Sequence, residues 1–256
     1  NSYSEPLGRL CLQIVAMHTF MTRVAAVPGS GVQQVRARQW LRKLDSKSLL
    51  LLAMCGDAAD ECARLCHFCD SEDMDVAMLG GILEDFKKRM TSLFGPQRSC
   101  LGSGYTSSIT QCLKHNKLVW IDGKVVRHIS EPSASDHDWA FSEMASFLRL
   151  ALAELSVEFP SFEVTQAFRV FDVSSGNKHW SIDNPDVQAD LARLAKVFQV
   201  DYSNFAEEFE RVRGRVVVEA KTSQSNPVAW ATVRRHLQMQ NSKCPSHQRR
   251  SLDGLF

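Results

Sequence analysis

Residues 79–96 have the sequence LGGILEDFKKRMTSLFGP, and this stretch decides the class of fold. Six apolar residues recur along it at spacings of three, one, three, four and three: Leu79, Ile82, Leu83, Phe86, Met90 and Leu93. These spacings place them on one face of an α-helix, and such a face is buried against a core. Gly95 and Pro96 then end the helix. The stretch therefore predicts an amphipathic helix in a helical protein.

Helical spacing also dominates the chain on both sides of this stretch. Towards the N-terminus, it predicts helices over 10–21, 32–44 and 46–69, the last capped by Asp45 or Ser46. Towards the C-terminus, it predicts helices over 135–159, 185–198, 201–216 and 226–237. Residues 162–171 are ambiguous, because they also fit a short helix that runs into a strand at 168–171.

One segment favours β-structure. Residues 118–126, LVWIDGKVV, place Asp-Gly between β-branched and aromatic residues, which is a strong signal of a β-hairpin. We expect loops near 95–108 and 129–136. The sequence thus predicts a mainly α fold, a multi-helix array with one short β-hairpin near 118–126. We divide it into a single mainly helical region over 1–222, a C-terminal helix over 223–240 and a polar, basic tail over 241–256.

The composition is that of an ordinary globular protein. The 256 residues include 30 Lys and Arg against 29 Asp and Glu, so the net charge is +1; 44% are hydrophobic and 23% charged. These values exclude a chain that is disordered throughout, and also a protein whose overall charge drives it onto polyanions. The longest apolar run, Leu49–Cys55, is far shorter than the roughly 18 residues of a membrane span. We therefore expect no membrane partner.

Four of the eight cysteines lie in the helix predicted over 46–69: Cys55, Cys62, Cys66 and Cys69. With His67, they offer half of a zinc site, because zinc binds converging thiolates and imidazoles. No second Cys pair follows at the spacing of a zinc finger, and the four recur on one helix side at intervals of seven, four and three. We therefore favour a cysteine-rich stripe in the core over a zinc site. We predict no metal and no cofactor.

No pattern of residues indicates catalysis, and we predict no catalytic residues. The acidic run at 70–75 lacks the alternating oxygens and the bend glycine of a calcium loop. The segment Asp136-His137-Asp138 lies at a predicted helix start, where capping explains it. Gly102-Ser103-Gly104 lacks the rest of a phosphate-binding loop, and no nucleophile–base pair is legible.

Basic residues gather in two places. One group lies in the helix predicted over 32–44: Arg36, Arg38, Arg42 and Lys43. The other lies near the C-terminus: Arg234, Arg235, Lys243, Arg249 and Arg250. Both groups can neutralise phosphates, although a solvated helix face and a polar tail explain them about equally well. We take the second group as the candidate nucleic-acid-binding residues, with DNA as the candidate partner.

Several segments resemble the hAT superfamily of transposases, most of all its domesticated, zinc-finger-associated relatives. Residues 50–76 contain LLLA, then Asp57, then ARLCHFCDSEDMDV, with Cys69 where the family usually has Gln. Residues 159–172 contain FPS and then FRVFD, which is similar to the family's FP…FxVFDP segment, with Val173 in place of Pro. Residues 184–200 resemble the helix that follows, and the resemblance covers roughly 6–214.

In that family this segment is a mainly helical insertion that interrupts a ribonuclease-H-like catalytic core. The resemblance implies that two catalytic aspartates and an Arg-Trp motif lie upstream of Asn1. It also implies a catalytic Glu within a Ser-Glu-Arg-x-Phe-Ser segment, but Glu210-Arg211 is followed here by Val212-Arg213. Two-metal phosphoryl transfer needs converging carboxylates to hold both ions. We therefore expect a chain that is not an enzyme.

The resulting expectation is a fragment or remnant of a hAT-like transposase, with weak DNA binding that does not depend on sequence. Its start at Asn1 rather than Met also favours a fragment. The alternative is a helical protein–protein interaction module, whose partners are other protein helices or a second copy of the chain. No signal-peptide pattern precedes Met17, so we expect reduced cysteines and a nuclear (by resemblance) or cytoplasmic protein that is not secreted.

Overall fold

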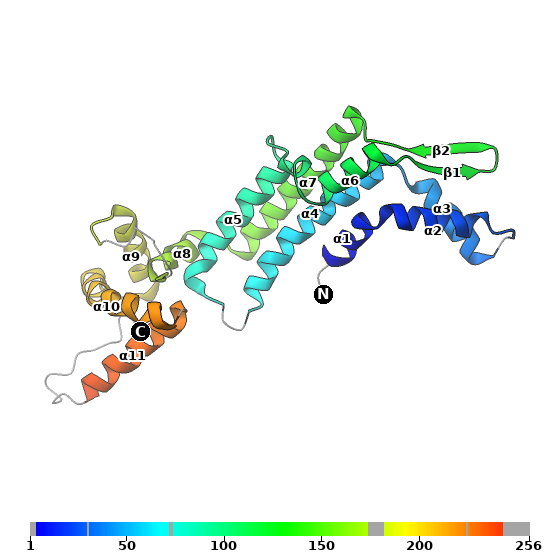
Figure 1. Ribbon diagram of the computed structural model, residues 1–256. Coiled ribbons are helices and arrows are strands. Elements are labelled where there is room, and N and C mark those ends of the chain that lie inside the picture. The colour runs from blue at the N-terminus through cyan, green and yellow to red at the C-terminus, as the bar shows by residue number, and fades with distance from the viewer. Residues whose placement is uncertain (1–3, 30, 72–73, 174–181, 224, 243–256) are drawn as a thin grey trace. The chain divides into compact units, whose positions relative to one another are not determined.

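The computed structural model describes residues 4–29, 31–71, 74–173, 182–223 and 225–242. Within these ranges the chain forms eleven α-helices, two short 3-10 helices and one antiparallel pair of strands (Figure 1). The predicted mainly α fold with one hairpin is therefore confirmed. None of the described helices is both long and apolar enough to cross a membrane.

Contacts group the chain into two compact units. Unit 1 comprises Asn1–Cys69 and Asp85–Leu155, and unit 2 comprises Asp70–Glu84 and Ser156–Phe256. The division at 222 and 240 that the sequence favours stays a prediction. Each unit is described separately below.

Unit 1 is built around one long helix, α4 (Ser46–Cys69), together with the second half of α5 (Val76–Phe94) and most of α7 (Ala134–Glu158). Leu50, Met54 and Ala58 of α4 pack with buried residues of α5 and α7. On its other buried side, Leu49 and Ala53 pack with α1 (Ser4–Leu12), α2 (Ile14–Ala26) and α6 (Gly104–His115). The remaining elements of unit 1 are α3 (Val32–Lys43), η1 (Ser99–Leu101), β1 (Leu118–Asp122) and β2 (Val125–Ile129).

The α7 helix allows a matched test of this core. Leu148 is 9% exposed and belongs to the same cluster as Phe86 and Met144, whereas Leu150 is 60% exposed. Truncating Leu148 to Ala should lower the free energy of unfolding by about 2 kcal/mol, because buried apolar contacts are lost. Truncating Leu150 to Ala should cost less than about 0.5 kcal/mol. Chemical denaturation of both variants measures the difference, and equal costs would show that the buried face of α7 is wrongly assigned.

A buried carboxylate of α4 holds the start of α6. Asp57 is 7% exposed and accepts hydrogen bonds from Tyr105 N (2.7 Å), Thr106 N (3.1 Å) and Thr106 Oγ1 (2.6 Å). The first turn of a helix leaves such N–H groups without partners inside the helix. Burial raises the pKa of the Asp57 carboxyl, and these hydrogen bonds oppose that rise. Asp57 therefore caps α6 from a different helix.

Gly104 makes this close approach possible. Its φ is +76°, in the left-handed region, and a Cβ at this position would lie 2.3 Å from Asp57 Oδ1. Both the backbone conformation and the lack of space therefore require glycine at the first residue of α6.

The segment 95–108 differs from the loop that its sequence predicts. It contains η1, and α6 begins within it at Gly104. Ser103 makes no side-chain capping hydrogen bond, since the cap is supplied by Asp57. The helix start depends on a tertiary contact, which the local sequence does not reveal. The second predicted loop is shorter than 129–136, because β2 continues to Ile129 and α7 begins at Ala134.

The hairpin pairs Leu118 with Ile129 at its base and Asp122 with Val125 at its tip. Its two turn residues are Gly123 and Lys124, and of these only Gly123 has a positive φ, of 64°. A positive φ at the first turn residue alone is the pattern of a type II′ turn, which suits the twist of a hairpin. The second strand extends beyond the predicted limit at 126.

Unit 2 contains α8 (Phe162–Ala167), η2 (Phe168–Phe171), α9 (Pro185–Phe198), α10 (Tyr202–Ser223) and α11 (Asn226–Ser242), with the first half of α5. Residues 168–171 form a 3-10 helix, so the alternative of a strand there is wrong. Their aromatic side chains are the reason: Phe171 packs edge-to-face on Trp230 (5.2 Å) and Phe209 (5.9 Å) within the core. Asn184 caps α9 by accepting from Asp186 N, as its sequence predicts.

The cysteines of α4 do not form a core stripe. Cys55 and Cys66 are exposed, and Cys62 and Cys69 are half-buried. The prediction is wrong because the buried positions of α4 are taken mainly by Leu, Met and Ala. Of the four cysteines, Cys62 packs against the core but is only half-buried. Among the described residues, no group of three or more His, Cys, Asp or Glu side chains could hold a metal ion.

Candidate nucleic-acid interface

The structure describes two of the five predicted nucleic-acid-binding residues. Arg234 and Arg235 are exposed on α11. The other three, Lys243, Arg249 and Arg250, lie outside the described residues. The predicted set therefore cannot be assembled as one surface from this structure.

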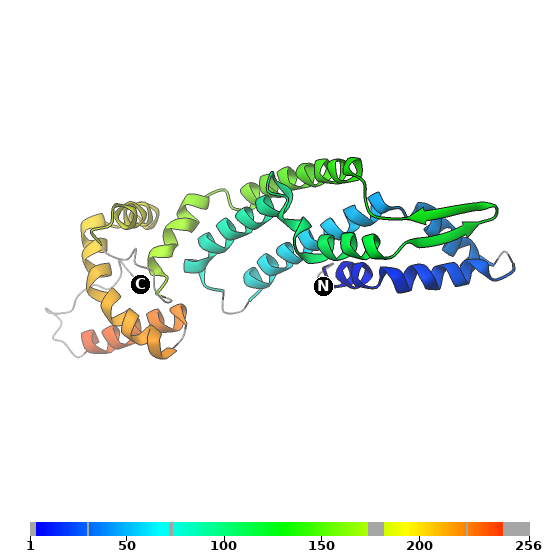
Figure 2. The same ribbon diagram turned by 45° about the horizontal axis from the view of Figure 1, so that its top comes forward.

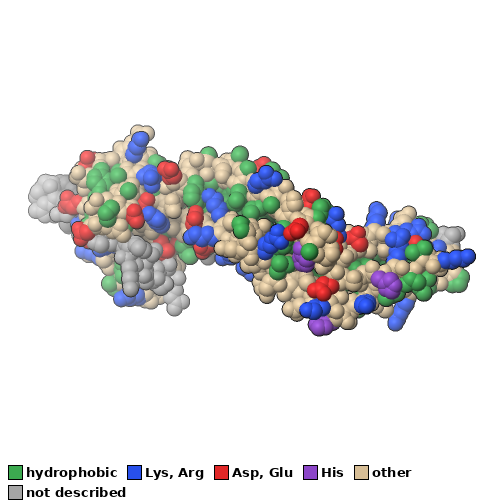
Figure 3. Space-filling model, turned by 90° about the horizontal axis from the view of Figure 1, so that it is seen from above, with side chains coloured by type: hydrophobic (Ala, Val, Ile, Leu, Met, Phe, Trp, Pro, Cys, Tyr) green, Lys and Arg blue, Asp and Glu red, His purple; other side chains and the backbone are tan. Residues whose placement is uncertain are grey.

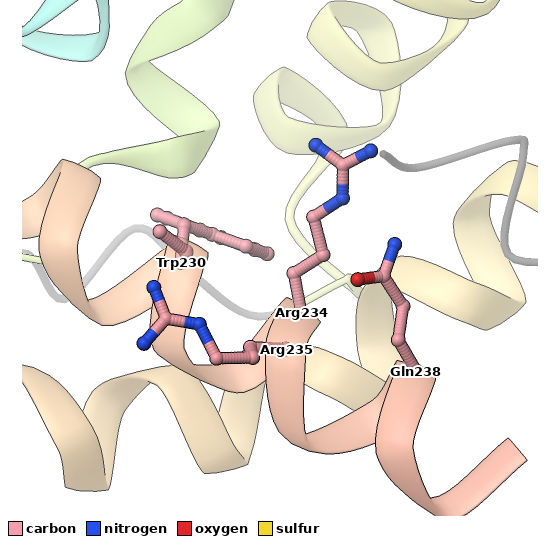
Figure 4. Close-up of a pocket in the computed structure, with 5 residues that line it drawn as sticks. Trp230, Arg234, Arg235 and Gln238 are labelled. Carbon is pink, nitrogen blue, oxygen red and sulfur yellow. The ribbon is translucent and has the colours of Figure 1, made fainter. Parts of the chain in front are cut away.

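Arg234 and Arg235 line a shallow pocket of about 450 Å³ with Trp230, Ala231 and Gln238 (Figure 4). The Trp230 ring is fixed, because its Nε1 donates to Phe171 O (2.8 Å) and it stacks on Phe209. Neighbouring helical residues point about 100° apart, and Figure 4 shows the two guanidinium groups directed away from each other. They therefore offer two separate contacts and do not form a clamp around one phosphate.

A larger set of positive charges lies in unit 1. Residues 14–43 and 114–129 together contain nine Lys and Arg residues and a single acidic residue, Asp122. These segments form α2, α3, the end of α6 and the hairpin, which lie together in both ribbon views (Figures 1 and 2). We call this part the basic end of unit 1. Its nine basic residues are Arg23, Arg36, Arg38, Arg42, Lys43, Lys114, Lys117, Lys124 and Arg127.

The positive charges of the basic end face solvent. Eight of the nine basic residues are exposed, and only Arg38 is half-buried. Figure 3 shows Lys and Arg side chains gathered at the end of unit 1 that carries the hairpin, at the right of the view, with His among them. The basic end is thus strongly positive although the whole chain has a net charge of only +1.

The acidic residue of this region is already paired. Arg42 donates from Nε to Asp122 Oδ2 (2.8 Å) and from Nη2 to Oδ1 (3.1 Å), and Arg127 Nε lies 3.9 Å from Oδ2. The hydrogen bond from Arg42 holds the pKa of the Asp122 carboxyl below its ordinary value. A bidentate pair of this kind also fixes α3 to the hairpin. Asp122 therefore stays ionised and paired, and it cancels one of the nine positive charges of this region.

A pocket of about 650 Å³ lies between α2, α3 and β1 in this region. Its lining residues are Thr22, Ala25, Ala26, Arg38, Arg42 and Val119–Gly123. Both ribbon views show β1, and not β2, on the side of α2 and α3 (Figures 1 and 2). Arg38 is held at the pocket wall, because its Nε (3.2 Å) and Nη2 (3.0 Å) donate to Ala25 O.

The sequence contains a signal for the basic end beyond the four basic residues of α3. The four basic residues of α3 stand out, but the contribution of Lys114, Lys117, Lys124 and Arg127 depends on the hairpin folding beside α2 and α3. Residues 14–43 and 114–129 are each nearly free of acidic residues, and this pattern indicates both segments of the basic end.

Comparisons with known proteins give no match: no family model, no curated protein and no solved structure is significantly similar to this chain. The resemblance to hAT transposases therefore stays a prediction that depends on the quoted segments alone.

Proposed function

We propose that this chain binds nucleic acid through the phosphate backbone, with the basic end of unit 1 as its main contact surface. The observation that carries the proposal is the concentration of nine basic residues around one paired carboxylate. Lys and Arg at such a surface neutralise phosphates and release condensed counterions, which gives affinity without reading the sequence. Arg234 and Arg235 supply a second, weaker contact on α11.

We also propose that the chain derives from a hAT-like transposase and retains the helical insertion of that family without its catalytic activity. The support is the resemblance of 50–76 and 159–172, together with Val212-Arg213 where the family's Glu segment would continue. On this proposal the protein is nuclear, and it neither nicks nor joins DNA. A plasmid-nicking assay with Mg²⁺ or Mn²⁺ should show no cleavage by the chain. Metal-dependent cleavage that disappears when one acidic residue of this chain is changed to Ala would overturn it.

The proposed binding is tested by fluorescence anisotropy with duplexes of unrelated sequence over a series of salt concentrations. Between five and eight phosphate contacts should give a slope of log K against log salt of about −4 to −7. The affinity should be the same for each duplex, since no base contact is invoked. Binding that ignores salt, or no binding at roughly 50 mM salt, would contradict the proposal.

A helical protein-interaction module is the second candidate function. Within unit 1, the α7 helix exposes Phe147 and Leu150, one turn apart, and apolar side chains of this kind suit a partner helix. If the chain binds no nucleic acid but its sedimentation shows association that Leu150→Lys abolishes, this second function is the better one.

A further inference from the structure

We propose that the pocket between α2, α3 and β1 binds a phosphate monoester group, such as the phosphorylated end of a nucleic-acid strand. The inference rests on the proposed function, because it names the chemical group that the basic end would hold. It concerns a partly open pocket and not the exposed charges around it.

Two guanidinium groups are fixed at the pocket wall in the same way. Arg38 uses Nε and Nη2 on Ala25 O, and Arg42 uses Nε and Nη2 on the Asp122 carboxylate. No other hydrogen bond of either guanidinium is found in the described part of the chain, so each keeps Nη1 for a further acceptor. Side chains that are already held lose little freedom when they bind an anion.

Thr22 adds a hydroxyl group with unused hydrogen-bonding capacity. Thr19, one turn earlier on α2, donates its Oγ1 to Val15 O (2.8 Å), which is the usual arrangement inside a helix. Thr22 Oγ1 is buried and has no hydrogen-bond partner within the described residues, although Thr22 lines the pocket. A buried hydroxyl without a partner is costly, and a phosphate oxygen in the pocket would supply its acceptor after rotation about χ1.

The charge of the pocket favours a terminal group over a continuous backbone. Helices α2 and α3 and strand β1 line it, and its volume of about 650 Å³ is that of a small-molecule site. Ala25, Ala26 and Trp120 give it apolar walls, which strengthen charge-assisted hydrogen bonds. A monoester carries about −1.5 to −2 charge at pH 7, whereas a diester within a strand carries one. Asp122 would oppose either anion, and its charge offsets that of Arg42. The net positive charge at the pocket therefore comes from Arg38 and from Arg127, whose Nε lies 3.9 Å from Asp122 Oδ2.

The test compares two single strands of identical sequence, one with a 5′-phosphate and one with a 5′-hydroxyl, by anisotropy with the full chain. The phosphorylated strand should bind about tenfold more tightly, as expected for added hydrogen bonds to a charged group. Inorganic phosphate should remove this preference at concentrations that leave the binding of the hydroxyl strand unchanged. If the chain binds inorganic phosphate but binds the phosphorylated strand no more tightly than the hydroxyl strand, the same chemistry is supported. The ligand of the pocket is then a free phosphate compound.

Two variants locate the effect. Thr22→Val preserves the shape of the side chain and removes a hydroxyl that has no partner, so the melting temperature should not fall. It should remove most of the preference for the phosphorylated strand, and Arg38→Gln should do the same. Arg36→Gln is the matched control, because it removes one charge from the same helix outside the pocket and should weaken both strands equally.

Equal affinities of the two strands, with inorganic phosphate also without effect, would overturn the inference and leave the proposed function intact. A preference that survives in both Thr22→Val and Arg38→Gln would also overturn it, because the phosphate would then bind elsewhere. Failure to bind these strands and the duplexes alike would instead overturn the proposed function.

Discussion

Replacing Asp57 by Ala should lower the free energy of unfolding by about 3–4 kcal/mol. The substitution removes three hydrogen bonds and leaves N–H groups at the start of α6 without an acceptor, including that of the fully buried Thr106. The cost of burying the carboxylate is removed as well, which keeps the loss below the sum of the three bonds. Hydrogen exchange at the Tyr105 and Thr106 amides, together with chemical denaturation, measures the effect.

Asp45→Ala provides the control. Asp45 also caps a helix, because its Oδ1 accepts a hydrogen bond from Ser48 N (2.7 Å) at the start of α4. Unlike Asp57, it is exposed and caps only the helix that directly follows it. Its loss should cost about 1 kcal/mol, the ordinary value for an N-cap. If the two variants were equally stable, Asp57 would be a local cap and not a link between α4 and α6.

Changing Arg36, Lys43, Lys124 and Arg127 together to Gln should weaken nucleic-acid binding on the order of 100-fold or more near 0.1 M salt. All four side chains are exposed at the basic end, and none of them lines the pocket between α2, α3 and β1. Loss of four phosphate contacts should also make the slope of log K against log salt shallower by about 3 to 4. Salt titrations of this variant and of the unmodified chain give both quantities.

The matched control changes Lys88, Arg149, Lys196 and Lys221 to Gln. It removes the same net charge from exposed positions outside the basic end. Its affinity and salt slope should stay close to those of the unmodified chain. An equal loss in both variants would mean that overall charge, and not this surface, governs binding.

The helices were predictable where a local pattern determines them. The spacing within 79–96 and the Asn184-Pro185 start of α9 need only neighbouring residues, and both predictions are confirmed. The start of α6 was missed because its cap comes from Asp57 on another helix. The prediction of a buried cysteine stripe is wrong for a related reason. Spacing shows which residues share a side of a helix, but not which side the other helices cover.

The candidate site was less predictable than the fold. Arg234 and Arg235 follow one another in the sequence, yet a helix directs them apart. The basic end needs two segments, 14–43 and 114–129, to come together, and no local signal states that they do. Its pocket depends further on Arg38 meeting the end of α2 and Arg42 meeting the hairpin.

The contact between Gly104 and Asp57 also constrains how this protein can evolve. Any other residue at 104 places a Cβ against Asp57 Oδ1, and Asp57 is needed only while α6 starts at that place. A substitution at either position is therefore deleterious while the other position keeps its present residue. Loss of the carboxylate would remove the clash but not the positive φ, so position 104 should remain glycine for as long as α6 begins there.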